Sequence, residues 1–512
     1  MAYVRPSASD IDSWMEENKG WSWAELEPYY RKSETYLPGH EKLRDAFSAD
    51  PTFHGQTGPI QVSFPPTPAP FEDSLIRAFD EMSNLTRPKD PFNGENLGFF
   101  EALATIDRRA GKVGRSYAAT GYLAPVLGRP NLKIITDATA DRILLYNDIT
   151  GIKARGVKFW HSGDLHEVLA KNEVILSAGT IQSPRLLELS GIGHPEILKA
   201  AAIDCVVPLR DVGENLQEHP MTSLTYELVA GNLTIDSLFL DQTLLQAHLE
   251  QLAVAQSGFL AGNMGLMGFI PYASQVSKKR LSETITTILS SGNENDFQQS
   301  QLQHISARLQ DPQSASIQFV GIPANFDLEN GHANQSLLMP GAPPGRNACY
   351  TMLISSCYPV SRGSTHVPPA ISASPTSSHE EPPRIDVGII THQADVDVLS
   401  AGLSFADRVF SSKHVSMKVA RRVDPPPEVD VQNLDQAREF VRDRVMVFNH
   451  MLGTCAMGLV VDERLRVKGV EGLRVVDASV IPAQISGNIV STVYAVAEKA
   501  ADMIKKDSLL FM

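Results

Sequence analysis

Cysteine is scarce in this chain, with four copies in 512 residues, and no two of them have the C-x-x-C spacing that is typical of metal ligands. A disulfide between Cys349 and Cys357 is compatible with the sequence, but buried free thiols are the expected state. The sequence therefore predicts neither a metal site nor a framework of disulfides. The four residues are Cys205, Cys349, Cys357 and Cys455.

Long apolar runs and clusters of basic residues are also missing. No stretch of about 18 apolar residues is present, so no membrane-spanning segment is expected. The first residues lack the apolar core of a secretion signal, and this leaves the compartment open. The formal charge of −14 argues against a nucleic-acid partner, since neutralising phosphates requires clustered Lys and Arg.

What is present is an ordinary globular composition, with 43% hydrophobic and 20% charged residues. A chain of this length can bury a large core, so it is expected to fold as two domains or as one two-lobed unit. Residues 1–36 contain Ser22 as the expected cap of a helix that includes Leu26, Tyr29 and Tyr30.

Residues 132–184 contain a series of patterns that predict strands, turns and the start of a helix. Residues 132–145, 156–160 and 168–176 have strand-like apolar patterns separated by polar turns, which predicts a small antiparallel sheet. Residues 174–176 then run into a turn, Ser177 to Gly179, and Ser183-Pro184 is the expected start of a helix.

The middle of the chain has a different character. Residues 244–262 are expected to form an amphipathic helix followed by a turn, and residues 278–313 are expected to form exposed helices and loops. Residues 317–322 and 348–355 are expected to form strands. Residues 367–384 are rich in Pro and Ser and predict a surface loop. Pro425 to Pro427 marks the expected return to the first lobe.

The C-terminal stretch, residues 447–503, combines features that point to chemistry. His450 ends an apolar run and is followed by Gly-Thr-Cys, small residues that let a backbone approach a flat ligand. A strand at 473–476 ends in a polar turn, Asp477-Ala478-Ser479. Asn488 is the expected cap of a final helix whose amide groups would favour negative charge. Singly, these residues are more often structural, so the ordered set is what indicates a site.

This ordered set resembles the glucose-methanol-choline (GMC) family of flavin-dependent oxidoreductases. The H-x-x-G-T motif at His450 and the later Asn488 match the family's C-terminal pair. Residues 179–193 match its second signature, G-x-x-x-S-P-x-L-L-x-x-S-G-I-G. The resemblance implies an α/β (α+β) fold, with an FAD-binding lobe from residues 1–222 and 425–512 and a substrate lobe, built on an antiparallel sheet with helices, from residues 223–424.

One family element has no match in this chain, the G-x-G-x-x-G turn that holds the diphosphate of a dinucleotide. The nearest candidate, Gly191-Ile192-Gly193, has Glu196 at the sixth position and follows a helical run. The Rossmann-like sheet is therefore expected to lack its first βαβ unit. The expectation is that the chain is an N-terminally truncated product of a longer gene, or that it binds flavin weakly.

The resemblance implies FAD as the cofactor and a small-molecule alcohol as the substrate. Specialised metabolism is one setting that it implies for the reaction. The alcohol carbon would give a hydride to flavin N5, and His450, with an ordinary pKa of about 6.5, would take the hydroxyl proton. Asn488 would orient the substrate oxygen, and His219 would order a loop. Oxygen or a quinone would reoxidise the flavin. The implied cofactor neighbours are Ala140, Ala178, Gly179, Asp477, Ala478, Asn488 and Ile489.

Two alternatives stay open at this point. The missing glycine turn favours a flavin-free remnant or pseudoenzyme, and some family members are non-redox cyclases on the same scaffold.

Overall fold

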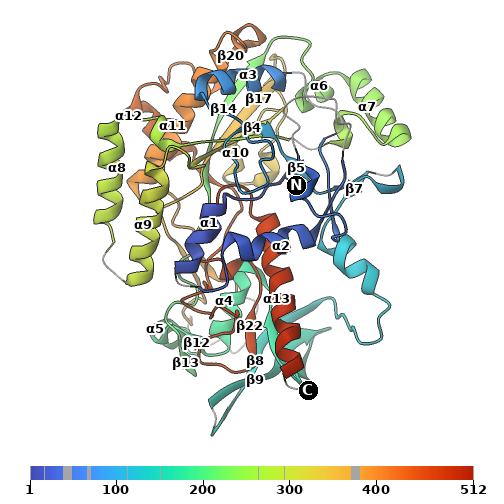
Figure 1. Cartoon of the computed structure of the whole chain (residues 1–512), viewed down its shortest axis with the longest axis vertical. Coiled ribbons are helices and arrows are strands. Elements are labelled where there is room, and N and C mark those ends of the chain that lie inside the picture. The colour runs from blue at the N-terminus through green and yellow to red at the C-terminus, as the bar shows by residue number, and fades with distance from the viewer. Residues whose placement is uncertain are drawn as a thin grey trace.

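The computed structural model of the chain describes residues 2–16, 18–38, 49–65, 71–111, 113–149, 151–262, 265–292, 295–370 and 381–510. These residues form two hydrophobic cores, one around a large antiparallel sheet and one around the C-terminal helix. In Figure 1 the sheet occupies the upper half of the molecule, and the C-terminal helix α13 (Val490–Leu510) extends downward from the centre.

The large sheet has the strand order β20 (Val419–Asp424), β14 (Pro220–Leu228), β17 (Cys349–Ser356), β16 (Ile317–Ile322), β15 (Leu266–Ile270) and β4 (Gly98–Glu101), and β21 (Met446–Val447) also pairs with β14. Because side chains alternate across a strand, Phe319 points to one face, where its ring contacts Phe79 of α3 (Glu72–Ser83) and Phe405 of α11 (Gln393–Phe410). Gln318 points to the other face. It shares its register row with Phe269 and Ser355.

The second core joins segments from both ends of the chain. Strand β11 (Val174–Leu176) pairs in parallel with β22 (Leu473–Val475), beside α4 (Gly179–Leu189). Helix α2 (Trp23–Ser33) packs on α13, where the Tyr30 hydroxyl lies 2.8 Å from the Thr492 hydroxyl. The expected small antiparallel sheet is present as β8 (Ala138–Asp148), β9 (Gly151–His161) and β10 (Asp164–Leu169).

The described residues also form eight further α-helices and five pairs of short strands. They are α1 (Ala8–Asp12), α5 (Pro195–Ala200), α6 (Ile235–Leu240), α7 (Gln242–Ala255), α8 (Lys278–Ser290), α9 (Asp296–Gln310), α10 (Leu328–Gly331) and α12 (Leu434–Arg444), and the pairs β1 (Ala2–Tyr3) with β5 (Leu103–Ala104), β2 (Glu34–Tyr36) with β3 (Ile60–Val62), β6 (Ile106–Asp107) with β7 (Gly114–Arg115), β12 (Ile192–Gly193) with β13 (Val207–Pro208) and β18 (Ser364–His366) with β19 (Arg384–Asp386).

Most sequence expectations of secondary structure are confirmed. The expected α/β (α+β) fold is present, Ser22 caps α2 in a capping box with Glu25, and the strand at 317–322 has the expected bounds. All four cysteines are free, and Cys349, Cys357 and Cys455 are buried. Part of the expected loop at 367–384 lies outside the described residues. The domain boundaries stay a prediction, and strands β4 and β21 join the sheet of the middle range from both outer ranges.

Three expected boundaries were wrong. The strand expected over 132–145 begins only at Ala138, and the run expected over 168–176 is two strands, β10 and β11. Helix α4 begins at Gly179 rather than at Ser183, so Pro184 lies inside it. Proline has no N–H to give to the carbonyl of Thr180 four residues earlier. The Thr454 hydroxyl donates to that carbonyl instead, at 2.6 Å, and this contact from a distant segment allows the helix to start early.

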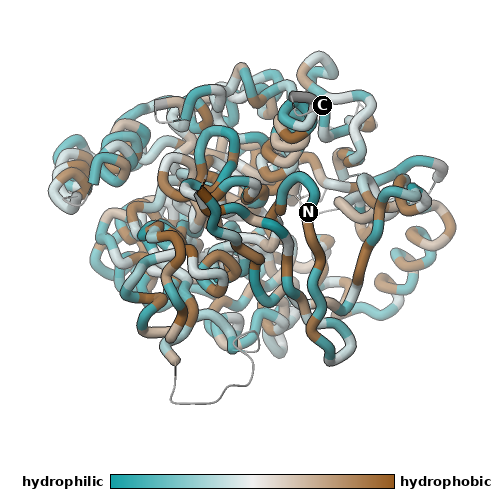
Figure 2. Tube along the Cα trace, turned by 90° about the horizontal axis from the view of Figure 1, so that it is seen from below, coloured by the Kyte–Doolittle hydropathy of each residue, from teal (hydrophilic) through white to brown (hydrophobic). Residues whose placement is uncertain are grey.

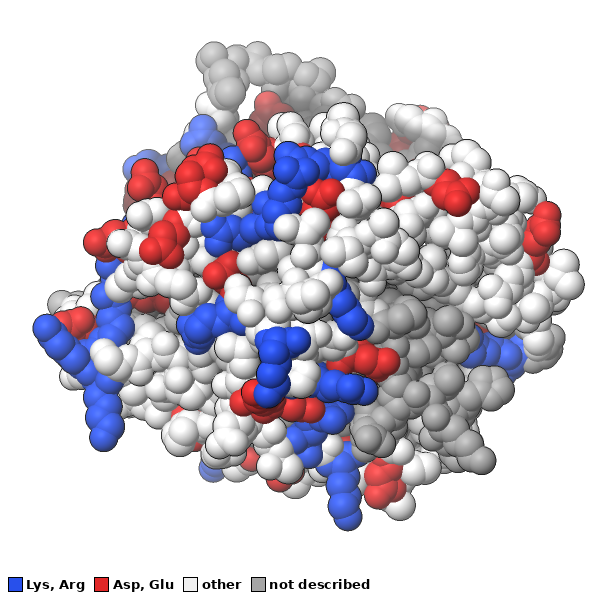
Figure 3. All heavy atoms as spheres, turned by 90° about the horizontal axis from the view of Figure 1, so that it is seen from above, with Lys and Arg blue, Asp and Glu red and all other residues white. Residues whose placement is uncertain are grey.

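Hydropathy and charge are both mixed rather than segregated. Apolar and polar stretches alternate along the chain, as the tube in Figure 2 shows. On the face in Figure 3, basic and acidic side chains of the described residues are intermixed rather than gathered into one basic field. Within the described ranges, no helix has the length and apolar character needed to cross a bilayer.

Candidate active site

The two residues expected to carry the chemistry lie side by side. His450 follows β21 and is only 8% exposed, and Asn488 precedes α13. Asn488 Nδ2 lies 3.0 Å from His450 Nε2, although 38 residues separate them in the chain. Val490 and Tyr494 of α13 pack against the core of the large sheet, and Val496 and Ala500 belong to the other core. The pair therefore sits where the two cores meet.

The expectation that Asn488 caps the final helix was wrong. Helix α13 begins at Val490, and the Asn488 side chain bonds elsewhere: its Nδ2 faces His450, and its Oδ1 lies 3.2 Å from Nε2 of Gln318. A capping asparagine would use its oxygen on amides of the first helical turn. Here residues distant in the chain contact both the oxygen and the nitrogen of the carboxamide, so the side chain lies at the site and does not cap the helix.

Two residues hold His450: His219, which the sequence analysis expected only to order a loop, and Glu218, which it missed. His219 Nδ1 lies 3.0 Å from His450 Nδ1, and the two rings meet edge to face at an interplanar angle of 85°. The Glu218 carboxylate accepts from the backbone N–H of His450, at 2.8 and 3.0 Å, and from that of His219, at 2.8 Å. His219 thus orders more than a loop, because it and Glu218 fix the position and the ring orientation of His450.

Burial dominates the electrostatics of this cluster. Burial lowers the pKa of His219 to about 4, against a smaller opposing effect of the backbone of Ile485 and Cys357. Burial and the neighbouring His219 hold the pKa of His450 well below its ordinary value, so the expected pKa near 6.5 was wrong. Burial also raises the pKa of Glu218 to about 7. His450 is accordingly an uncharged imidazole at neutral pH, with a lone pair to accept a proton.

Asp477, an expected cofactor neighbour, ties two turns together. Its Oδ2 accepts from the Gly179 N–H at 2.9 Å and from the Ser183 hydroxyl at 2.5 Å, and its Oδ1 accepts from the N–H of Ser479 at 2.9 Å. The turn before α4 and the turn after β22 therefore form one unit. Ala178 and Ala478 lie in these turns, and the Thr180 hydroxyl donates to the carbonyl of Met451, the residue after His450, at 2.8 Å.

The residues expected to contact the cofactor are accessible. Ala140 and Ala178 are exposed, and the other five are partly exposed. Gly179 has a φ of +84°, and a Cβ added there would meet no atom within 4 Å, so the backbone is open to a ligand. Exposed apolar residues lie along the same segments: Leu132, Ile134, Ile135 and Ile175. An open glycine, small residues and an apolar surface fit a flat, elongated dinucleotide.

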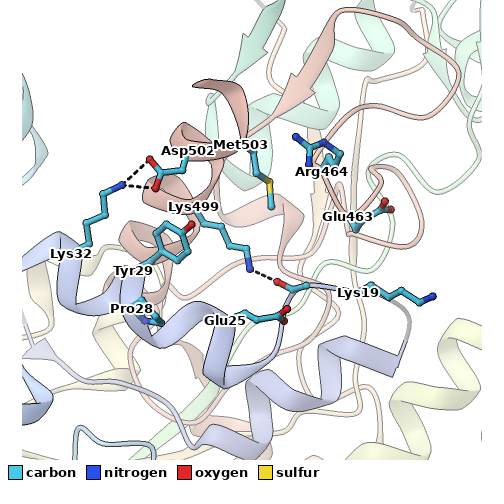
Figure 4. Close-up of a pocket in the computed structure, with 11 residues that line it drawn as sticks. Lys19, Glu25, Pro28, Tyr29, Lys32, Glu463, Arg464, Lys499, Asp502 and Met503 are labelled. Atoms are coloured by element: carbon cyan, nitrogen blue, oxygen red, sulfur yellow. Dashed lines mark hydrogen bonds and ion pairs between the residues drawn. The ribbon is translucent and has the colours of Figure 1, made fainter. Parts of the chain in front are cut away.

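A separate hollow of about 670 Å³ lies between α2 and α13 (Figure 4). Two of its lysines have partners: Lys32 pairs with Asp502 at 2.8 Å, and Lys499 donates to the carbonyl of Gly20 and lies over the Trp21 ring. These contacts join the two helices, and His450 and Asn488 are not among the residues that line the hollow. We therefore interpret the hollow as part of the packing contact between α2 and α13.

Comparisons with known proteins agree on one family. Two family models, both described as GMC oxidoreductase, match residues 1–221 and 370–497. Dehydrogenase citC of Monascus ruber is 48% identical over 518 residues, covering 99% of this chain and 82% of that protein. An oxygen-dependent choline dehydrogenase of Cronobacter sakazakii is 31% identical, covering 99% and 78%. A solved FAD-dependent oxidoreductase from Chaetomium thermophilum superposes with a TM-score of 0.86 at 26% identity, covering 99% and 84%.

Proposed function

The chain belongs to the GMC oxidoreductase family, and from this premise we propose that it is an FAD-dependent oxidoreductase that oxidises an alcohol group of a small organic molecule. The observation that carries the proposal is the 3.0 Å contact between His450 and Asn488 at the junction of the two cores. It joins a proton acceptor to a hydrogen-bond donor, the two functions that alcohol oxidation needs besides a redox group.

FAD is the cofactor of the family, and when bound it supplies the acceptor for the hydride that leaves the carbinol carbon. The residues that would hold it are Ala140, Ala178, Gly179, Asp477, Ala478, Asn488 and Ile489, in the accessible segments described above. Asp477 would act indirectly, by keeping the two turns in register, since its carboxylate is already engaged with Gly179, Ser183 and Ser479.

The chain's own residues supply the proton chemistry. His450 Nε2 would accept the proton of the substrate hydroxyl, and its low pKa keeps it in the uncharged form that can do so. The Asn488 amide would donate a hydrogen bond to the substrate oxygen and so orient it. His219 and Glu218 would hold the imidazole at its position, because its ring nitrogen and its backbone N–H are both engaged by them. Oxygen or a quinone would serve as the final electron acceptor.

The absorbance spectrum of the purified chain, before and after incubation with FAD, is the first test. Oxidised flavin bands that survive gel filtration are the expected result. A folded protein that never acquires these bands would contradict the proposal and favour a flavin-free remnant. Turnover of a substrate with no electron acceptor present would favour a non-redox cyclase.

The second test is turnover of alcohols by His450→Ala in the flavin-loaded protein. Loss of the proton acceptor is expected to lower kcat by about 10²- to 10⁴-fold while the flavin bands remain. His166→Ala is the matched control, because that histidine lies exposed on β10 and its loss should leave kcat unchanged. Full activity in His450→Ala would remove the central assignment.

A further inference from the structure

Gln318 is a polar residue at the centre of the large sheet, in an otherwise apolar strand. Its side chain is fully buried on the face that turns toward Asn488. The amide Nε2 lies 3.2 Å from Asn488 Oδ1 and 3.4 Å from the Met267 sulfur, and Oε1 has no partner among the described residues. Leaving a buried amide oxygen unpaired is unfavourable. A residue kept at this cost to stability is expected to serve the site beside it.

The hydrogen bonds from Gln318 to His219 form one continuous chain, and the Asn488 amide sets its direction. The amide nitrogen Nδ2 of Asn488 lies 3.0 Å from His450 Nε2, and an amide nitrogen only donates. His450 Nε2 is therefore an acceptor, and the ring proton of the uncharged imidazole belongs on Nδ1. His450 must then donate from Nδ1 to His219.

The hydrogen bonds on the other side of His450 lead back to the large sheet. With its proton on Nδ1, His450 has an unprotonated Nε2, which accepts from the Nδ2 amide of Asn488. The Asn488 oxygen then faces Gln318 and requires a donor, and Nε2 of Gln318 is that donor. Every bond in the chain donates in one direction, from the sheet toward His219. An asparagine amide can turn over in its site, and Gln318 favours one of its two orientations.

We propose that Gln318 is a positioning residue that sets the tautomer of His450. It holds the Asn488 amide with its nitrogen toward His450, and this keeps the proton-accepting Nε2 free of a proton. The role rests on the proposed function, because an unprotonated Nε2 matters only if that atom receives the substrate proton. The sheet of the substrate lobe thereby acts on the chemistry through Asn488, without contact with His450.

The tautomer can be read in the protein without substrate or flavin. In protein labelled with 15N-histidine, the unprotonated ring nitrogen resonates far from the protonated one, and His450→Gln identifies the signals of His450. The wild type is expected to show a His450 that is protonated on Nδ1. A His450 protonated on Nε2 in the wild type would overturn the proposal.

Two variants remove or reverse the donor. Gln318→Met keeps the volume and removes the amide, so the His450 signals should shift toward a mixture of tautomers. Gln318→Glu, when ionised, can only accept, so the Asn488 amide should turn over and place the His450 proton on Nε2. Ser355→Ala, in the same register row and bonded to the Pro220 carbonyl, should leave the His450 signals unchanged. A wild-type tautomer in either folded Gln318 variant would overturn the proposal.

This readout separates the two proposals. A purely structural role of Gln318 would lower thermal stability and leave the tautomer unchanged. Absence of flavin or of turnover would contradict the proposed function and leave the spectrum of the wild type as it is. Where an active alcohol is found, Gln318→Met is expected to lower kcat more than it raises KM, since the substrate keeps its binding surface and loses its prepared base.

Discussion

Two histidines of this protein, one fully buried and one partly buried, have pKa values shifted in opposite directions. His219 lies in the active-site cluster among neutral partners, and burial lowers its pKa to about 4. His366, at the end of β18, is 2.7 Å from Glu188 and 3.1 Å from Glu214, and these carboxylates raise its pKa to about 9. Burial disfavours the cation in both places. The presence or absence of a carboxylate on the ring nitrogens therefore decides which form is stable.

The difference separates a structural use of histidine from the chemical use that we propose for His450. His366 joins β18 to α4 as a cation, and Glu188 also accepts from the Val367 N–H at 2.7 Å. The histidines at the site stay uncharged, so His450 keeps a lone pair for a proton. Four experiments test whether the contacts of the two histidines explain this difference.

Removing the buried carboxylate should have the largest effect. Glu188→Ala leaves the His366 cation without its closest partner and the Val367 N–H unpaired, and it is expected to lower the free energy of unfolding by about 3–5 kcal/mol. Urea denaturation at pH 7 measures this. Glu214→Ala is the matched control, because Glu214 is 46% exposed and contacts the same ring, so a loss of at most about 1 kcal/mol is expected. Equal losses would contradict the distinction.

The stability of the protein at acid pH tests whether His219 is a buried neutral group. Its folded pKa of about 4 lies below the ordinary value of about 6.5, so the unfolded chain binds the proton first and stability falls as the pH falls through that window, by about 3 kcal/mol. Glu218, with a pKa of about 7, acts in the opposite sense between about pH 4.5 and 7. The contribution of His219 is therefore measured as the difference in unfolding free energy between the wild type and a His219 variant.

The measurement is the unfolding free energy of the wild type minus that of His219→Gln, at several pH values. This difference should shrink as the pH falls from about 6.5 to about 4. A difference that stays constant with pH would mean that His219 is not a buried neutral group.

The stability of the protein at alkaline pH tests His366. The expected effect is somewhat smaller than that of His219. The folded pKa of His366, about 9, is above the ordinary value, so its contribution is complete below about pH 6.5 and is lost as the pH rises through 9. Since Glu214 is partly exposed, solvent screening reduces the expected contribution to about 2 kcal/mol. His366→Gln should flatten the alkaline decline of stability. An unchanged decline would assign it to other groups.

The smallest expected effect concerns a neutral hydrogen bond to the same helix. Thr454→Val removes the hydroxyl that donates to the Thr180 carbonyl, left free by Pro184, and should lower the free energy of unfolding by about 1 kcal/mol. Thr454→Ser keeps the hydroxyl and serves as the control. A loss as large as that of Glu188→Ala would show that charge is not what distinguishes the two contacts.

Local patterns predicted much of this molecule. The capping box at Ser22, the apolar run at 317–322 and the signature at 179–193 depend on neighbours in the chain, so their structures could be predicted. The start of α4 could not, because the contact that compensates Pro184 comes from Thr454, 274 residues from its acceptor. Gln318 left a weak signal, a single polar residue in an apolar strand.

The order of residues along the chain was enough to identify the family and its FAD cofactor and to predict the pair His450 and Asn488, because motifs record residue type and order. The surroundings of the pair became known only from the packed molecule. The low pKa values of His219 and His450, the His219 imidazole beside Nδ1 of His450 and the Gln318 amide beside Asn488 all involve groups distant in the chain. Burial and hydrogen-bond direction are properties of the packed molecule, and burial keeps His450 uncharged.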